Sequence, residues 1–113
     1  MTNEQLCALA KQGDADAQNL LIENNLRFIK KTAHEVWSAQ AELNRALRIA
    51  LDDLVQEGSL GLCDCIESYN PSSGNLFLTY AAPAIRNAMI DYTQMLFLNG
   101  HHKAFLNNKS KKS

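Results

Sequence analysis

Apolar residues recur at helical spacing along most of the chain, and this pattern limits the folds open to it. Ile22, Leu26, Ile29, Ala33 and Val36 follow one another at intervals of four, three, four and three residues, which places them on one face of a helix. No segment alternates apolar and polar residues as a half-buried strand does. At 113 residues the chain fits one domain. We therefore expect an all-α fold, a compact bundle of about four to five helices.

Capping residues and glycine divide the first half of the chain into helices. Thr2 and Gln5 have the spacing of a capping box, and the helix that they start should stop at Gly13. A second, long helix should begin near Asp14 and contain all five of the apolar residues named above. A third helix, or a helical connector, is expected over residues 39–51, which lack Gly and Pro.

The next helix should start at Asp52 and Asp53. Glycine inside a helix costs about 1 kcal/mol relative to alanine. The inward positions of Gly58 and Gly61 therefore indicate that another helix packs closely against this one. A turn is expected over residues 70–74, whose sequence is NPSSG.

The last helix contains Pro83, which fits the first turn of a helix because its missing N–H is little loss there. We therefore expect this helix to start shortly before Pro83 and to end before Gly100. The helical domain then covers residues 1–98. Residues 99–113 are basic and lack an apolar period, which predicts a disordered tail.

Composition argues against several classes of protein. No window approaches the roughly 18 to 20 apolar residues of a membrane span, and the N-terminus lacks a signal core, so we expect a cytoplasmic protein without membrane contact.

The three cysteines cannot pair completely, and residues 63–65 lack the second ligand pair that zinc needs. No acid/base pair or nucleophile with an orienting partner stands out, and His34, His101 and His102 are expected on the surface. We expect no enzyme activity, no metal and no cofactor.

An acidic stripe marks the outer side of the helix after Asp52. Its members recur at intervals of four, three, four and three residues, and they are Asp53, Glu57, Leu60, Asp64 and Glu67. A charged helix face is often merely solvated. The single sign of charge and the leucine within it favour a basic partner helix instead.

Three aromatic residues, Tyr69, Phe77 and Tyr80, bracket the predicted turn and lie close in sequence to Arg86 and Asn87. Aromatic rings beside amides suit the capture of unstacked bases, and each stacked base contributes about 1 to 3 kcal/mol. The same aromatics, taken alone, also fit a hydrophobic core. Both interpretations stay open at this point.

The chain resembles region 2 of the sigma-70 family of RNA polymerase sigma factors in three blocks: ENNLRFI at 23–29, DLVQEGSLGL at 53–62 and FLTYA at 77–81. The blocks stand in the family's order, and the resemblance covers residues 13–94. It implies a helical domain that docks on the clamp helices of the largest subunit of core RNA polymerase. It also implies recognition and melting of the promoter −10 element during transcription initiation.

The resemblance implies which residues make each contact. Polymerase docking falls to Asp53, Gln56, Glu57, Ser59 and Cys63, and the acidic stripe adds Leu60. Binding of promoter DNA, mainly its non-template single strand, falls to Asn25, Tyr69, Asn70, Phe77, Leu78, Thr79, Tyr80, Arg86, Asn87 and Ile90. Arg27, Lys30 and Lys31 are the basic residues of the second helix that could contact phosphates.

The chain departs from primary sigma factors where Pro83 and Ala84 replace a pair of tryptophans. Residues 85–91 resemble the flagellar type, so an alternative sigma factor of the sporulation or flagellar type is the closer relation. From residue 53 to residue 92, five acids accompany Arg86 alone, a balance that disfavours duplex DNA. The alternative hypothesis is therefore a degenerate or truncated module that binds polymerase, or an anti-sigma factor, without opening a promoter.

Overall fold

The structure is a computed structural model that describes the backbone over residues 1–111 and the side chains over residues 1–100. The described chain forms six α-helices and one short 3₁₀ helix, with no strand among its residues. The prediction of an all-α fold is confirmed. The helices are α1 (Asn3–Lys11), α2 (Ala15–Asn24), α3 (Leu26–Ala39), α4 (Ala41–Ala46), α5 (Leu51–Ser68), η1 (Pro71–Ser73) and α6 (Phe77–Lys111).

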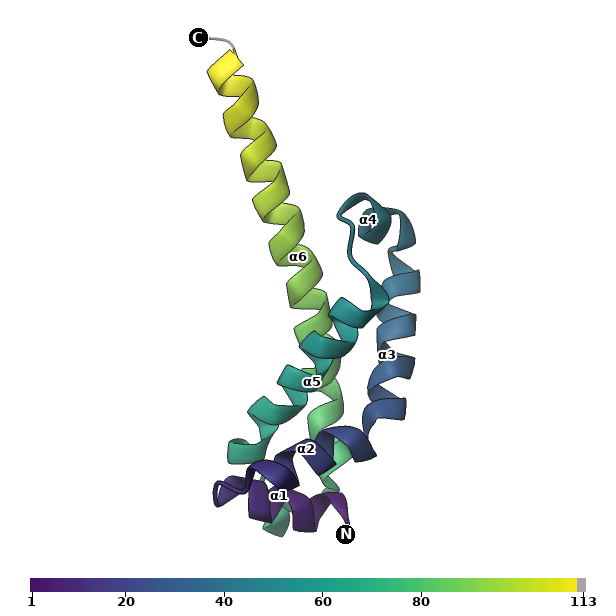
Figure 1. Ribbon diagram of the computed structural model, residues 1–113, viewed down its shortest axis with the longest axis vertical. Coiled ribbons are helices and arrows are strands. Elements are labelled where there is room, and N and C mark those ends of the chain that lie inside the picture. The colour runs from purple at the N-terminus through teal and green to yellow at the C-terminus, as the bar shows by residue number, and fades with distance from the viewer. Residues whose placement is uncertain (112–113) are drawn as a thin grey trace.

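Helices α3, α5 and α6 form the centre of the bundle, with α5 packed along α6 and α3 packed against both. Helices α1 and α2 close the end of the bundle at which α6 begins, while α4 lies at the opposite end (Figure 1). The C-terminal part of α6 extends beyond the other helices (Figure 1). The molecule is therefore elongated, with extents of 60 × 25 × 25 Å.

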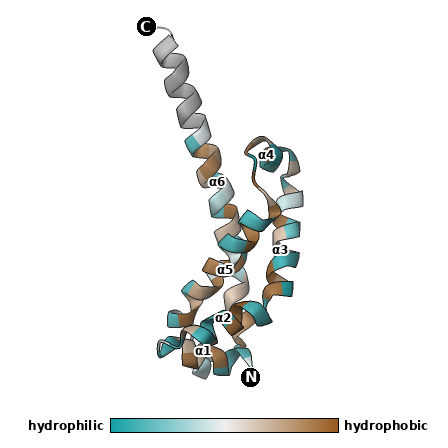
Figure 2. Cartoon of the chain, in the orientation of Figure 1, coloured by the Kyte–Doolittle hydropathy of each residue, from teal (hydrophilic) through white to brown (hydrophobic). Residues whose placement is uncertain are grey.

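The hydrophobic core lies where these helices meet, and the outer side of α3 is largely hydrophilic (Figure 2). A fully buried aliphatic or phenylalanine side chain contributes about 1.5 to 3 kcal/mol, so the core is the main source of stability. Its largest fully buried apolar side chains are Leu6, Leu21, Ile29, Leu54, Leu62, Phe77, Ile85 and Met89.

Two glycines let the backbones of α5 and α6 approach closely, as predicted. A Cβ added at Gly61 would lie 2.8 Å from the carbonyl oxygen of Ala84 and 2.9 Å from the Cβ of Ala88. A Cβ added at Gly58 would lie 2.3 Å from the terminal methyl group of Met89. The packing at Gly61 therefore involves the backbone of α6. The packing at Gly58 involves side chains alone, the flexible end of Met89 and, at 3.2 Å, the Cγ2 methyl groups of Ile29 and Ile85.

The predicted starts of the first two helices are confirmed. Thr2 Oγ1 accepts a hydrogen bond from the N–H of Gln5 at 3.1 Å, and Gln5 Oε1 accepts one from the N–H of Thr2 at 2.8 Å. Asp14 Oδ1 accepts from the N–H of Ala17 at 3.1 Å. Gly13 has a φ of 99°, which glycine adopts without strain and which turns the chain between α1 and α2.

The single long helix predicted to begin near Asp14 is wrong, because the chain breaks at Asn25 into α2 and α3. Asn25 has φ −111° and ψ 9°. Its Nδ2 donates to the carbonyl oxygen of Leu21 at 2.7 Å, and such side-chain bonds compete with the regular helix. No Gly or Pro marks this break in the sequence.

The helix predicted over residues 39–51 is wrong in its extent, since α4 ends at Ala46. Arg48 adopts a left-handed conformation with φ 59°. Trp37 Nε1 donates to the carbonyl oxygen of Ile49 at 2.9 Å, and the Ile49 side chain is buried. The chain therefore leaves the helix because Ile49 is held against the core.

Asp53 belongs to the start of α5, as predicted, but it caps the helix from inside the first turn. Ala50 precedes the first helical residue, and its N–H donates to Asp53 Oδ2 at 2.9 Å. Asp52 also lies in this turn, where negative charge interacts favourably with the helix dipole. The Asp53 carboxylate is therefore already engaged in a hydrogen bond within the fold.

Helix α6 starts at Phe77, so the expectation that Pro83 lies in its first turn is wrong. The N–H of Phe77 donates to Glu4 Oε2 at 2.8 Å, and this carboxylate from α1 satisfies a backbone donor at the helix start. Pro83 lies inside α6, where it cannot donate to the carbonyl oxygen of Thr79. A contact between distant parts of the sequence thus fixes the start of α6.

Helix α6 also continues past Gly100 to Lys111. The predicted helix end before Gly100 is therefore wrong, while the disorder predicted for the basic tail stays a prediction. The boundary between a domain over 1–98 and a basic tail over 99–113 stays a prediction. The side chains of residues 101–113 lie outside the described part of the chain.

We expect Gly61→Ala to destabilise the fold more than Gly58→Ala. Overpacking costs about 1 to 3 kcal/mol, and at Gly61 the added methyl group meets backbone that cannot move aside. At Gly58 the Met89 side chain can shift, and the gain in helix propensity of about 1 kcal/mol offsets the cost. Urea unfolding followed by circular dichroism compares the two variants, and equal stabilities would contradict this account.

We expect Glu4→Ala to lower the free energy of unfolding by about 1 kcal/mol, the typical cost of removing a helix cap. Glu4→Gln keeps an acceptor oxygen for the N–H of Phe77 and serves as the control. Urea unfolding of both variants measures the difference. A loss of equal size in Glu4→Gln would assign the effect to charge rather than to the cap.

Candidate docking and nucleic-acid surfaces

The residues predicted to dock on polymerase lie on the outer side of α5. Leu60 is 54% exposed and Gln56 is also exposed, whereas Asp53, Glu57, Ser59 and Cys63 are half-buried. A leucine exposed among polar residues offers a partner an apolar contact. The outer side of α5 therefore combines carboxylates with one accessible apolar side chain.

Ser59 and Cys63 lie at the inner edge of this surface and are engaged within the fold. Ser59 Oγ donates to the carbonyl oxygen of Val55 at 2.8 Å, and Gln18 Nε2 donates to Cys63 Sγ at 3.5 Å. Burial raises the pKa of the Cys63 thiol, Asp64 raises it further, and the bond from Gln18 opposes the rise. Cys63 is therefore a neutral thiol at neutral pH.

The acidic surface extends from α5 onto α6, which the sequence did not predict. Leu60 lines a groove between the two helices together with Glu57, Asp64, Asp91, Tyr92 and Met95. Burial raises the pKa of the Tyr92 phenol, and Asp53 and Glu57 raise it further. The acidic character of Asp91 was visible in the sequence, but only the packing of α5 against α6 places it in this groove.

Two of the three aromatics predicted to bind DNA are part of the core. Tyr69 and Phe77 are buried, with ring centroids 5.3 Å apart in an edge-to-face arrangement, and the Tyr69 hydroxyl donates to the carbonyl oxygen of Asn75 at 2.6 Å. Tyr80 is 40% exposed, and its hydroxyl donates to Ser68 Oγ at 2.8 Å. Tyr80 is therefore the accessible aromatic of the three.

Asn25, also predicted to bind DNA, is buried inside the fold. It is 4% exposed, and its side-chain amide forms a reciprocal pair with that of Asn3, with both N···O distances at 3.0 Å. The second N–H of the Asn25 amide donates to Leu21. The side chain thus joins α1 to the junction of α2 and α3 rather than facing a ligand.

A second groove, between α3 and α6, brings together four of the residues predicted to bind DNA. Lys31 comes from α3, and Thr79, Arg86 and Asn87 come from α6. Arg86 Nη2 lies 2.6 Å from Glu35 Oε2, with both side chains about half exposed. Exposed ion pairs contribute only about 0 to 1 kcal/mol, so a phosphate could replace the Glu35 carboxylate. Arg27 and Lys30 are also exposed on α3.

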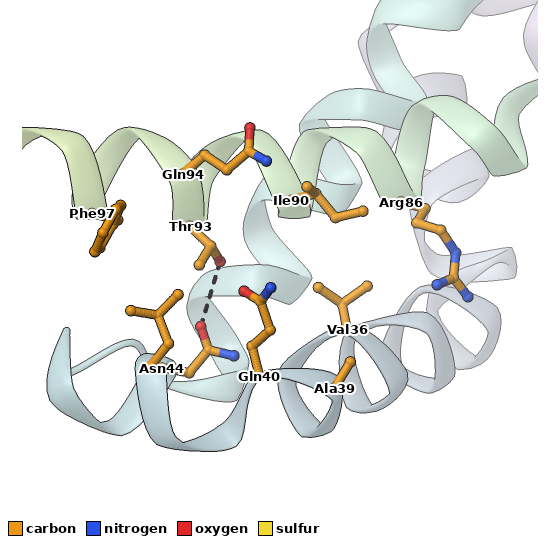
Figure 3. A pocket seen from close by; sticks show the side chains of 10 residues that line it. Val36, Ala39, Gln40, Asn44, Arg86, Ile90, Thr93, Gln94 and Phe97 are labelled. Atoms are coloured by element: carbon orange, nitrogen blue, oxygen red, sulfur yellow. Dashed lines mark hydrogen bonds between the residues drawn. The ribbon is translucent and has the colours of Figure 1, made fainter.

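Ile90 lies farther along α6, in a cavity of about 380 Å³ that Arg86 also lines (Figure 3). Two buried polar residues also line this cavity, and Thr93 Oγ1 donates to Asn44 Oδ1 there at 3.5 Å (Figure 3). Arg86 therefore connects the cavity to the groove between α3 and α6.

The last two residues predicted to bind DNA are Asn70, which precedes η1, and Leu78, in the first turn of α6. Asn70 is exposed, and its Oδ1 accepts from the N–H of Ser72 at 2.9 Å, while Leu78 is half-buried. The amide of Asn70 keeps its two N–H groups on the surface.

Among the described side chains, no group of three or more His, Cys, Asp or Glu residues could hold a metal ion. Cys7 and Cys65 are buried free thiols, and His34 is exposed as expected. No helix within the described residues is both long and apolar enough to span a membrane. His101 and His102 lie outside the described side chains.

The described part of the chain is an all-helical domain with acidic residues on the outer side of α5 and exposed basic residues on α3. Residues 21–94 match the Sigma-70 region 2 family. The chain belongs to this family, whose members are parts of transcription initiation factors.

Similar proteins are alternative sigma factors, as expected. The chain is 40% identical over 88 residues to the RNA polymerase sigma-28 factor of Bacillus thuringiensis subsp. kurstaki, covering 78% of this chain and 34% of that protein. It is 38% identical over 65 residues to the RNA polymerase sigma factor FliA of Escherichia coli K12, covering 58% of this chain and 26% of that protein. The chain thus spans about a third or less of the length of these curated relatives.

We expect Asn25→Ala to lower the free energy of unfolding by about 1 to 3 kcal/mol, because it leaves the Asn3 amide without its partner. A double-mutant cycle with Asn3→Ala should show that the two losses are not additive. Urea unfolding of the three variants measures this coupling. Unchanged stability together with weaker oligonucleotide binding would instead identify Asn25 as a DNA contact.

Proposed function

We propose that this chain is a sigma factor module that acts with core RNA polymerase in the cytoplasm. In this proposal α5 docks on the clamp helices of the largest subunit, and the face formed by α3 and α6 recognises and melts the promoter −10 element. The observation that supports it best is the gathering of Lys31, Thr79, Arg86 and Asn87 at one groove. Residues from separate blocks of the sequence meet there, as a composite binding surface requires.

Docking on α5 would use the side chains that the fold leaves accessible. Gln56 and Leu60 are exposed and Glu57 is half-buried. Carboxylates at the edge of an interface steer a basic partner and set the salt dependence of binding, while a central apolar side chain contributes affinity. Asp53, Ser59 and Cys63 are the more constrained members of the predicted set, because each is hydrogen-bonded within the fold.

Base capture would centre on Tyr80 and Asn87, which lie seven residues apart on α6 and therefore on one side of the helix. Tyr80 offers a ring for stacking and Asn87 an amide for hydrogen bonds to a base edge. Lys31 and Arg86 would contact phosphates beside them. Such a module stabilises opened DNA by binding alone and needs no covalent step.

The second candidate function is docking without promoter opening, either on polymerase or on an anti-sigma factor. The burial of Tyr69, Phe77 and Asn25 favours it, because it removes three of the predicted base contacts. Both candidates use α5, and only the first needs Tyr80.

Tyr80→Ala distinguishes the two candidates. Loss of one stacked base costs about 1 to 3 kcal/mol, so we expect a five- to 150-fold weaker capture of a single-stranded −10 oligonucleotide by the complex with core polymerase. Tyr80→Phe keeps the ring and serves as the control. Fluorescence anisotropy of the labelled oligonucleotide measures the affinity, and unchanged binding by Tyr80→Ala supports docking without promoter opening.

A further inference from the structure

The α6 side of the groove between α5 and α6, with Asp91, Tyr92 and Met95, has no role in the contacts implied by the resemblance. We infer that it belongs to the docking surface and seats one helix of the partner that bears Lys or Arg residues around an apolar side chain. In this arrangement Asp91, Tyr92 and Met95 of α6 are further determinants of partner specificity. The inference rests on the proposed docking through α5.

Apolar side chains on both walls of the groove are about half exposed to solvent. Leu60 on α5 is 54% exposed and Met95 on α6 is 50% exposed, and both line the groove. Gly61 and Ala88 line the groove between them, at a point where the two helices pack closely. An apolar side chain of a partner could therefore insert between Leu60 and Met95 and be covered from both sides.

Acidic residues surround this apolar strip. Glu57 and Asp64 contribute from α5 and Asp91 from α6, and no basic residue lines the groove in the described part of the chain. A cationic partner is the complement of such a surface. Nucleic acid is excluded as the occupant, because three carboxylates repel phosphates.

The shape of the groove favours a helix as the occupant. It runs along two packed helices, and a third helix can lie in such a groove with residues at intervals of three and four toward it. A second copy of this chain, placed by twofold symmetry, would bring the same acidic residues against these and is disfavoured by repulsion. Continuity with the outer side of α5 is a further argument, because Glu57 and Leu60 belong to both surfaces.

The experiment measures the affinity of the full chain for core RNA polymerase by competition with a labelled wild-type chain. Asp91→Lys should weaken binding about tenfold, and its affinity should depend less on salt than that of the wild type. Met95→Ala should weaken binding about threefold. Glu23→Lys makes the same change of charge at an exposed position outside the groove, and its affinity should stay within about twofold of the wild type.

Glu57→Lys separates the inference from the proposal on which it rests. If Glu57→Lys weakens binding while Asp91→Lys and Met95→Ala do not, docking on α5 stands and the groove is not part of it. If none of the three variants weakens binding, the proposed docking fails as well. A wild-type dimer in sedimentation that Asp91→Lys dissociates would make the groove an interface between copies of this chain and overturn the inference.

Discussion

The close packing of α5 against α6 at Gly61 is the contact on which the rest of the structure depends. With no side chain at this position, the α5 backbone lies against Ala84 and Ala88 of α6. This approach buries the inward face of α5 and leaves its acidic side exposed along α6. The groove lined by Leu60 and Met95 exists because the two helices are this close.

Helix α6 separates two surfaces of opposite charge. On the side of α5 it contributes Asp91 to a groove with two further carboxylates, and on the side of α3 it contributes Arg86 to a groove with Lys31. The net charge of the chain is only −1, so its overall charge conceals this division. Such segregation suits the proposed function, because mixed charges on one face would weaken the contacts both with a basic partner and with DNA.

Local patterns in the sequence predicted the features that depend on neighbouring residues. The capping box at Thr2, the break at Gly13 and the exposed stripe on α5 are set by residues within about one helical turn of one another. The missed features depend on distant contacts. Glu4 starts α6 by binding the N–H of Phe77, and Trp37 holds Ile49 and so shortens α4.

The sequence predicted only part of the candidate site, because some of its features depend on neighbouring residues and others on contacts between distant ones. Helical periodicity separates exposed from buried positions on α5, and a place in the core was already one of the two interpretations open for Tyr69. Periodicity could not show that Phe77 is buried, because the start of α6 was misplaced. Nor could periodicity along one helix show that Asp91 joins Glu57 across the groove, since that depends on how α5 and α6 pack.

The start of α6 also links the stability of α1 to the candidate DNA surface. Tyr80 lies in the first turn of α6, three residues after Phe77, and that turn is fixed by the Glu4 carboxylate. Its ring also lies 5.7 Å from the buried ring of Tyr69, and its hydroxyl is bound by Ser68 at the end of α5. Contacts from α1 and α5 therefore restrain Tyr80, and in the proposed capture of a base this restraint would reduce the entropy lost on binding.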